Sequence, residues 1–127
     1  MSDVSAAKPV KHPGPDHPIT IEPNPARVLV HSQGRVLADT RSALTLREAS
    51  YPPVQYVPLA DVDAALLEQT DHATYCPYKG DASYYTIAGA ERGENAVWEY
   101  RAPYPAVASI EGHVAFYPDR VELAEEA

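Results

Sequence analysis

One short segment gathers most of the side chains in this sequence that could do chemistry. Residues 72–85 contain the only cysteine, one of three lysines and four of nine tyrosines. A cysteine reacts as its thiolate, and a nearby cation favours that form. Lys79 lies three residues after Cys76 and His72 four residues before it, so either could supply the cation if the chain turns back. We therefore predict a site with Cys76 and Lys79 as catalytic residues; the alternative for a lone cysteine is a small buried apolar side chain.

Lys79 is the one lysine outside the N-terminal segment, and Gly80 follows it directly. A glycine beside an amine suits a place where the backbone approaches a ligand closely. The alternative is a structural ion pair, for which Glu48 or Asp81 offers the carboxylate. The sequence therefore predicts a Lys79 that either faces a ligand or is buried in a pair.

Aromatic side chains are dense around this segment and could line a pocket. Aromatic walls bind flat or cationic ligands, and phenolic hydroxyls orient them, although the same side chains also pack cores. In a strand Tyr84 and Tyr85 must point to opposite faces, so only part of the set can share one pocket. We favour Tyr84 and Trp98 as its central members. The predicted ligand-binding residues are His72, Tyr75, Tyr78, Tyr84, Trp98 and Glu48.

Two sets of side chains have the types that bind metal ions. His72, Cys76 and His113 would supply three ligands and leave an open position, as catalytic zinc requires. Asp61 and Asp63 are alternating carboxylates, which could hold Mg²⁺. Spacing alone does not bring the first set together, and an acidic pair of this kind commonly lies in a loop or begins a helix. We predict no metal site and no cofactor.

The charge balance argues against several classes of partner. The chain carries 18 acidic and ten basic residues, a formal net charge of −8. Nucleic acids and membrane headgroups are bound by clustered lysine and arginine, whereas the arginines here are scattered singly. A single cysteine forms no intramolecular disulfide, and no stretch reaches the ~18 apolar residues of a membrane span. We therefore predict a cytoplasmic protein that binds neither nucleic acid nor membrane, with its oligomeric state left open.

Prolines divide the chain into two parts. Pro9, Pro13, Pro15 and Pro18 block regular structure in residues 1–18, which we predict to be a flexible tail. Residues 19–127 have the length of one domain. The predicted strands within it are 27–31, 35–39, 43–47, 54–57, 83–88, 97–100, 113–117 and 121–123.

Turn residues suggest how some of these strands connect. Gly34 lies between the first two and predicts a hairpin, and Pro118-Asp119 predicts another between the last two. Residues 54–57 lie between prolines, which suits a strand at the edge of a sheet. Residues 61–68 fit either a helical turn or a short strand, and residues 106–111 fit one helical turn stopped by a glycine. The pattern predicts a mainly β fold, an open barrel or sandwich of short antiparallel strands with one or two short helical turns.

Four motifs resemble one known family. They are Glu22-Pro23-Asn24-Pro25, Cys76-Pro77-Tyr78-Lys79-Gly80, Trp98-Glu99-Tyr100 and Gly112-His113-Val114-Ala115-Phe116-Tyr117. Together they resemble the family catalogued as domain of unknown function 427, over nearly the whole predicted domain. The resemblance implies a β-tent, in which two open sheets lean together, as in B-type methionine sulfoxide reductases and the drug-binding domain of cereblon. Relatives of that fold often hold zinc on four cysteines, which this chain lacks.

The family's catalogue label also hints at nucleotidyl transfer, but the sequence has no glycine-rich phosphate loop. Three functions remain. The leading prediction is a small soluble domain that binds a small molecule in an aromatic-lined pocket around Cys76 and Lys79. The alternatives are a thiol-dependent enzyme with Cys76 as nucleophile, and a protein-interaction module whose binding face is the aromatic segment.

Overall fold

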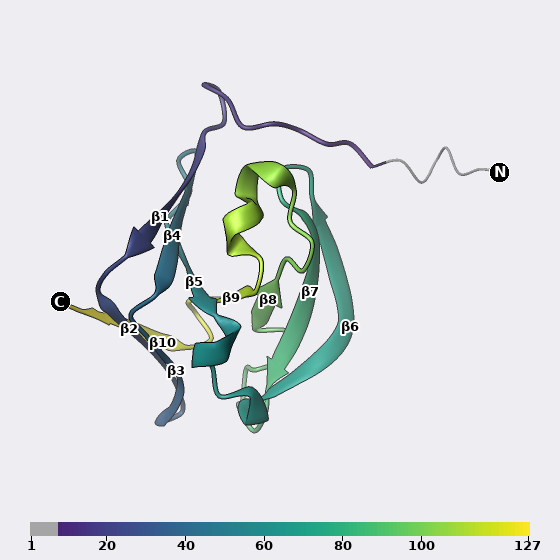
Figure 1. Cartoon of the computed structure of the whole chain (residues 1–127). Coiled ribbons are helices and arrows are strands. Elements are labelled where there is room, and N and C mark those ends of the chain that lie inside the picture. The colour runs from purple at the N-terminus through teal and green to yellow at the C-terminus, as the bar shows by residue number, and fades with distance from the viewer. Residues whose placement is uncertain (1–7) are drawn as a thin grey trace.

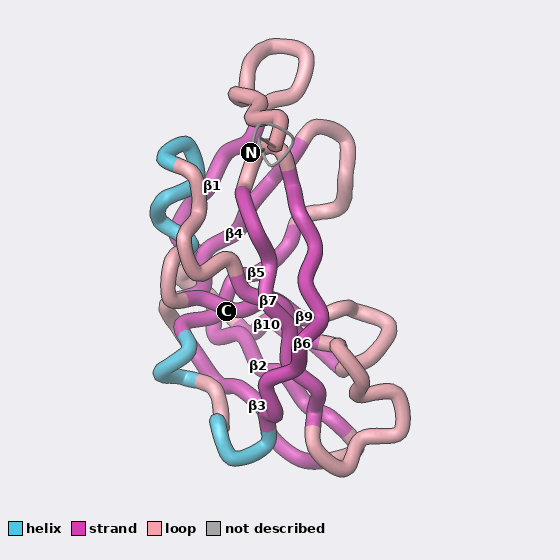
Figure 2. The backbone as a smooth tube through the Cα atoms, turned by 90° about the vertical axis from the view of Figure 1, so that its right-hand side faces the viewer, coloured by secondary structure: helices cyan, strands magenta, loops and turns pink. Residues whose placement is uncertain are grey.

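Short strands make up most of the chain in a computed structural model that describes residues 8–127 (Figures 1 and 2). The strands are β1 (Ile19–Asn24), β2 (Arg27–Ser32), β3 (Arg35–Thr40), β4 (Ala43–Glu48), β5 (Val54–Pro58), β6 (Leu67–Cys76), β7 (Gly80–Ile87), β8 (Val97–Glu99), β9 (His113–Phe116) and β10 (Glu122–Glu126). The helical segments are short 3-10 turns: η2 (Leu59–Asp61), η3 (Ala64–Leu66) and η4 (Pro105–Ile110). No helix in residues 8–127 is long and apolar enough to cross a membrane.

The strands form two open antiparallel sheets. The larger has seven strands in the order β1-β4-β5-β9-β8-β7-β6, and the smaller has three in the order β10-β2-β3. β1 and β6 are the edges of the larger sheet, and β1 carries Pro23, a residue that edge strands tolerate because it lacks an N–H. The predicted mainly β fold is confirmed, as is the hairpin of β2 and β3 around Gly34.

Two apolar clusters form the core. One joins the small sheet to one face of the large sheet through residues such as Val28, Val30 and Phe116. The other lies where η4 packs between β4 and β7, an arrangement visible in the centre of Figure 1. Its Val107 and Ile110 are fully buried. Because strand side chains alternate, consecutive residues of one strand supply different clusters.

Two predictions about the arrangement of strands are wrong. Residues 54–57 were predicted to form an edge strand, but β5 lies inside the large sheet between β4 and β9. Its prolines do not interrupt the hydrogen bonds of the sheet, because they precede the strand or, in the case of Pro58, end it. The last two strands form no hairpin: β9 pairs with β5 and β8, whereas β10 pairs with β2 in the other sheet. The chain crosses between the sheets at the turn around Pro118-Asp119.

Several local features complete the chain. Residues 61–68 contain the end of η2, then η3, capped by Asp63, and then the start of β6. Residues 8–18 run along the domain, where Lys11 N–H donates to the Pro77 carbonyl at 2.9 Å and Ala49 N–H donates to that of Pro18 at 2.8 Å. The part of the predicted tail before residue 8 lies outside the described residues, and flexibility of the rest stays a prediction.

Candidate functional site

A tight loop positions Lys79 between the two strands of the β6–β7 hairpin. Cys76 pairs with Gly80, so only three residues connect the strands. Gly80 adopts a φ of +110°, and a Cβ at this position would lie 3.4 Å from the Ala102 carbonyl oxygen, so both conformation and space favour glycine. The Lys79 N–H donates to the Cys76 carbonyl at 3.2 Å, and the Lys79 carbonyl accepts from Tyr104 N–H at 3.0 Å. The loop therefore fixes the lysine backbone at both ends.

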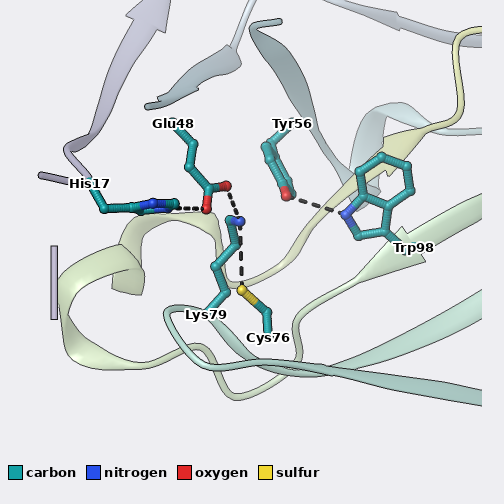
Figure 3. A network of polar contacts seen from close by, with 6 residues as sticks. All are labelled: His17, Glu48, Tyr56, Cys76, Lys79 and Trp98. Atoms are coloured by element: carbon teal, nitrogen blue, oxygen red, sulfur yellow. Dashed lines mark hydrogen bonds and ion pairs between the residues drawn. The ribbon is translucent and has the colours of Figure 1, made fainter. Parts of the chain in front are cut away.

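The Lys79 side chain turns inward and forms a buried ion pair with Glu48 at the end of β4 (Figure 3). Only 9% of the lysine side chain and 14% of the glutamate side chain are exposed. His17 Nε2 donates to the second carboxylate oxygen at 2.7 Å. The pairing of Lys79 with Glu48, one of the two partners predicted, is confirmed, and Asp81 instead pairs with Lys8 on the surface.

Opposing effects act on the Glu48 carboxyl. Burial alone would raise its pKa, but hydrogen bonds from Lys79 and His17 and their charges outweigh burial and lower the pKa below its usual value. Glu48 is therefore ionised at neutral pH, and the carboxylate, rather than the acid, accepts the two hydrogen bonds.

Acid is therefore expected to weaken the fold through Glu48. The pKa of Glu48 is lower in the folded protein than in the unfolded chain, where it is about 4.5. The ionised carboxylate therefore stabilises the fold at pH values above 4.5, and this stabilisation is lost as the pH falls through the folded pKa. Between about pH 7 and pH 3, the free energy of unfolding measured with urea should fall more steeply for the wild type than for Glu48→Gln. Identical pH slopes would show that Glu48 is not held ionised.

Cys76 lies beside the ion pair but on the edge of the site. Its sulfur accepts from Lys79 Nζ at 3.8 Å, and the side chain is partly buried against the cluster that contains η4. Cys76 is not among the residues that line the adjoining cavity. The thiol therefore contacts the lysine without itself facing the space a ligand would fill.

A cavity of about 280 Å³, here called the site hollow, opens beside the ion pair and is lined by both Lys79 and Glu48. Its walls are mostly aromatic: Tyr51, Tyr56, Tyr84, Trp98, Tyr100 and Tyr117. Trp98 Nε1 donates to the Tyr56 hydroxyl at 3.2 Å, and Figure 3 shows this pair facing each other beside the ion pair. Tyr84 is directly opposite Trp98 on the neighbouring strand, so both side chains share one face.

Three phenols of the site hollow, Tyr56, Tyr100 and Tyr117, have a raised pKa. Burial raises the pKa of Tyr56 and of Tyr100 well above the ordinary value. Burial and the neighbouring Tyr84 hydroxyl raise the pKa of Tyr117 to about 12. These hydroxyls therefore keep their protons at neutral pH and are able to donate hydrogen bonds.

The remaining predicted ligand-binding residues lie around the site hollow rather than in its lining. Tyr75 donates to the Pro9 carbonyl at 2.6 Å and contacts the Tyr104 hydroxyl at 2.7 Å. Tyr78 stacks on His17, with ring centroids 4.0 Å apart. His72 packs edge-on against Tyr84 and lines a second cavity that Tyr84 also lines. Tyr84 and Tyr85 do point to different clusters, as their alternation predicts.

The proposed metal ligands do not converge. Within residues 8–127, no group of three or more His, Cys, Asp or Glu side chains is placed to hold a metal ion. His113 Nδ1 is hydrogen-bonded to the Glu111 carbonyl at 2.9 Å. Asp61 accepts from Thr40 at 2.7 Å, and Asp63 caps η3.

Several residues of the site were not predicted from the sequence. His17 lies in the segment predicted to be a flexible tail, yet it forms a hydrogen bond with Glu48. Tyr51, Tyr56 and Tyr117 also line the site hollow, although all three lie far in sequence from Lys79. The aromatic side chains in the predicted strands 54–57 and 97–100 could have indicated these strands as walls of the pocket. Only the order of strands in the sheet, however, places them beside the β6–β7 loop.

Comparison with known proteins agrees with the resemblance seen in the motifs. A search of curated proteins found no match. The family model described as a domain of unknown function, DUF427, matches residues 20–127. This range covers all the strands, except that β1 begins one residue earlier, at Ile19. The chain therefore belongs to the DUF427 family.

Proposed function

We propose that this protein binds a small molecule in the site hollow. The observation that carries the proposal is the ion pair of Lys79 and Glu48, which is buried yet lines an aromatic-walled cavity. Burying two charges costs desolvation energy, and apolar side chains of similar size at the same positions often stabilise a fold equally well. Stability alone therefore does not account for a buried ion pair at this place. Binding sites combine such a few polar groups with mainly apolar walls.

The second cavity is larger, about 550 Å³, but a less suitable ligand site. Four charged side chains line it, Glu91, Arg92, Glu94 and Arg120. Arg92 is already paired with Asp119 on the surface, and such exposed pairs are well solvated. The site hollow, with its aromatic walls and its single buried pair, therefore supports binding better.

Filling the site hollow is expected to abolish binding. Val54 is partly buried and lines the cavity, so Val54→Phe would place a ring in the space of the ligand. Trp98, the only tryptophan, lines the same cavity and reports on its occupancy. A fluorescence screen of small metabolites should give saturable changes of Trp98 emission in the wild type and none in Val54→Phe.

Val36→Phe is the matched control, because Val36 is exposed on the small sheet and 49% of its surface is accessible. This variant should bind like the wild type. The proposal is wrong if folded wild-type protein gives no saturable change, or if the compounds found bind Val54→Phe equally well.

The alternative of a thiol-dependent enzyme stays a prediction. The distance of 3.8 Å between Cys76 Sγ and Lys79 Nζ supports it, since an ammonium favours the thiolate. The absence of Cys76 from the lining of the site hollow argues for binding as the leading function.

The proposal also includes a cytoplasmic location, no nucleic-acid partner and a β-tent arrangement of the two sheets. The single cysteine supports the cytoplasmic location, and the formal charge of −8 supports the absence of a nucleic-acid partner. The two open sheets support the third.

A further inference from the structure

Three side chains of the site hollow have hydrogen-bond donors without a partner among residues 8–127: Lys79, Tyr56 and Tyr100. A lysine ammonium has three N–H donors. Lys79 directs one to Glu48 and one to Cys76, which leaves a third for the cavity that the side chain lines. Both oxygens of the Glu48 carboxylate already accept hydrogen bonds, one from Lys79 and one from His17.

Tyr56 adds a second donor. Its hydroxyl oxygen accepts from Trp98 Nε1, and no partner within residues 8–127 accepts the hydroxyl proton. Only 2% of Tyr56 is exposed, so solvent outside the cavity offers little compensation. A buried hydroxyl proton without an acceptor destabilises the empty site, and a ligand acceptor would recover that loss.

Tyr100 adds a third donor. Its hydroxyl forms no hydrogen bond with any group in the described chain, although only 8% of the residue is exposed. The one fully enclosed side-chain nitrogen or oxygen without a partner in residues 8–127 is Nε of Arg120, so the Tyr100 hydroxyl reaches accessible space. Tyr100 lines the site hollow, and the Lys79 ammonium lies 6.0 Å from its ring centroid.

We infer that the ligand of the site hollow is a small planar molecule, neutral or anionic, with a carbonyl or carboxylate oxygen that accepts from Lys79, Tyr56 and Tyr100. This inference rests on the proposed function and specifies its ligand class. The aromatic walls would contact the planar part. We expect a cationic ligand, which aromatic walls alone would also accept, to bind less tightly, because it would meet the Lys79 ammonium while the Glu48 carboxylate is already paired with that ammonium.

Three probes that share a phenyl ring test this ligand class: benzoate, benzamide and benzylamine, which is a cation at neutral pH. Ligands of this size bind with Kd values of roughly 1 mM, which isothermal titration calorimetry at high protein concentration measures. We expect benzoate and benzamide to bind at least about tenfold more tightly than benzylamine. Tyr100→Phe should weaken benzoate and benzamide about tenfold, the loss of one hydrogen bond, and leave benzylamine unchanged.

Tyr85→Phe is the control for the substitution, because Tyr85 packs against the other apolar cluster and its hydroxyl donates to Glu99, outside the lining of the site hollow. It should leave all three affinities unchanged. Benzylamine binding as tightly as benzoate, or affinities unaffected by Tyr100→Phe, would overturn the ligand class and leave the pocket standing. Failure of all three probes would overturn the ligand class as well, whereas the metabolite screen with Val54→Phe decides separately whether the hollow binds ligands.

Discussion

Lys79→Met is expected to destabilise the fold by about 2–3 kcal/mol. The substitution leaves the Glu48 carboxylate buried, with 14% of its side chain exposed and only His17 as a partner. Breaking a fully buried pair costs about 3–5 kcal/mol, and the residual exposure and the histidine reduce this cost. Urea unfolding monitored by circular dichroism measures the change as a shift of the midpoint at constant m-value.

A double-mutant cycle separates the ion pair from simple loss of packing. Lys79→Met combined with Glu48→Leu should be more stable than Lys79→Met alone by about 1–2 kcal/mol, because no unpaired charge remains. Lys8→Met is the control, since its pair with Asp81 is exposed and should contribute less than about 1 kcal/mol. Additive effects of the two site substitutions would contradict a direct Lys79–Glu48 pair.

Ile110→Ala is expected to cost about 3–4 kcal/mol, the loss of buried methyl groups plus the cavity they leave. Ile110 is fully buried on η4, in the cluster that also contains Tyr56, Tyr84 and Tyr100. The substitution should therefore also loosen the walls of the site hollow and lower ligand affinity. Chemical unfolding and the calorimetric titration with benzoate check the two effects.

Leu123→Ala provides the comparison, because Leu123 on β10 is 37% exposed. Its expected cost is under about 1 kcal/mol, with no change in ligand binding. A cost for Ile110→Ala no greater than that for Leu123→Ala would show that η4 is not packed between β4 and β7.

Local sequence signals predicted most strands but not how they assemble. The hairpin of β2 and β3 follows from β-branched residues around Gly34, a short-range signal. The partners of β5, β9 and β10 depend on which sheet each strand joins, and this is decided by burial over the whole chain. The prolines near β5 were a misleading edge signal, because Pro58 lies at the strand end. β1 and β6 were missed as strands: β1 contains a proline, and exposed positions predominate in β6.

The site was predictable where its residues are close in sequence. The loop from Cys76 to Gly80 brings the thiol and the amine together by itself. Glu48 was identified because Lys79 required a carboxylate, although 31 positions separate them. His17 and Tyr56 could not be identified in this way. His17 reaches the site through the docking of residues 8–18, and Tyr56 through the order of strands in the large sheet.

A crystal structure of the protein soaked with benzamide would show whether the site hollow binds an acceptor ligand. We expect the ring among the aromatic walls of the site hollow, with the carbonyl oxygen at hydrogen-bonding distance from Lys79 Nζ and the Tyr100 hydroxyl, and with Glu48 still paired. Benzamide bound elsewhere with the hollow vacant, or a Lys79 side chain turned out to solvent, would contradict this expectation.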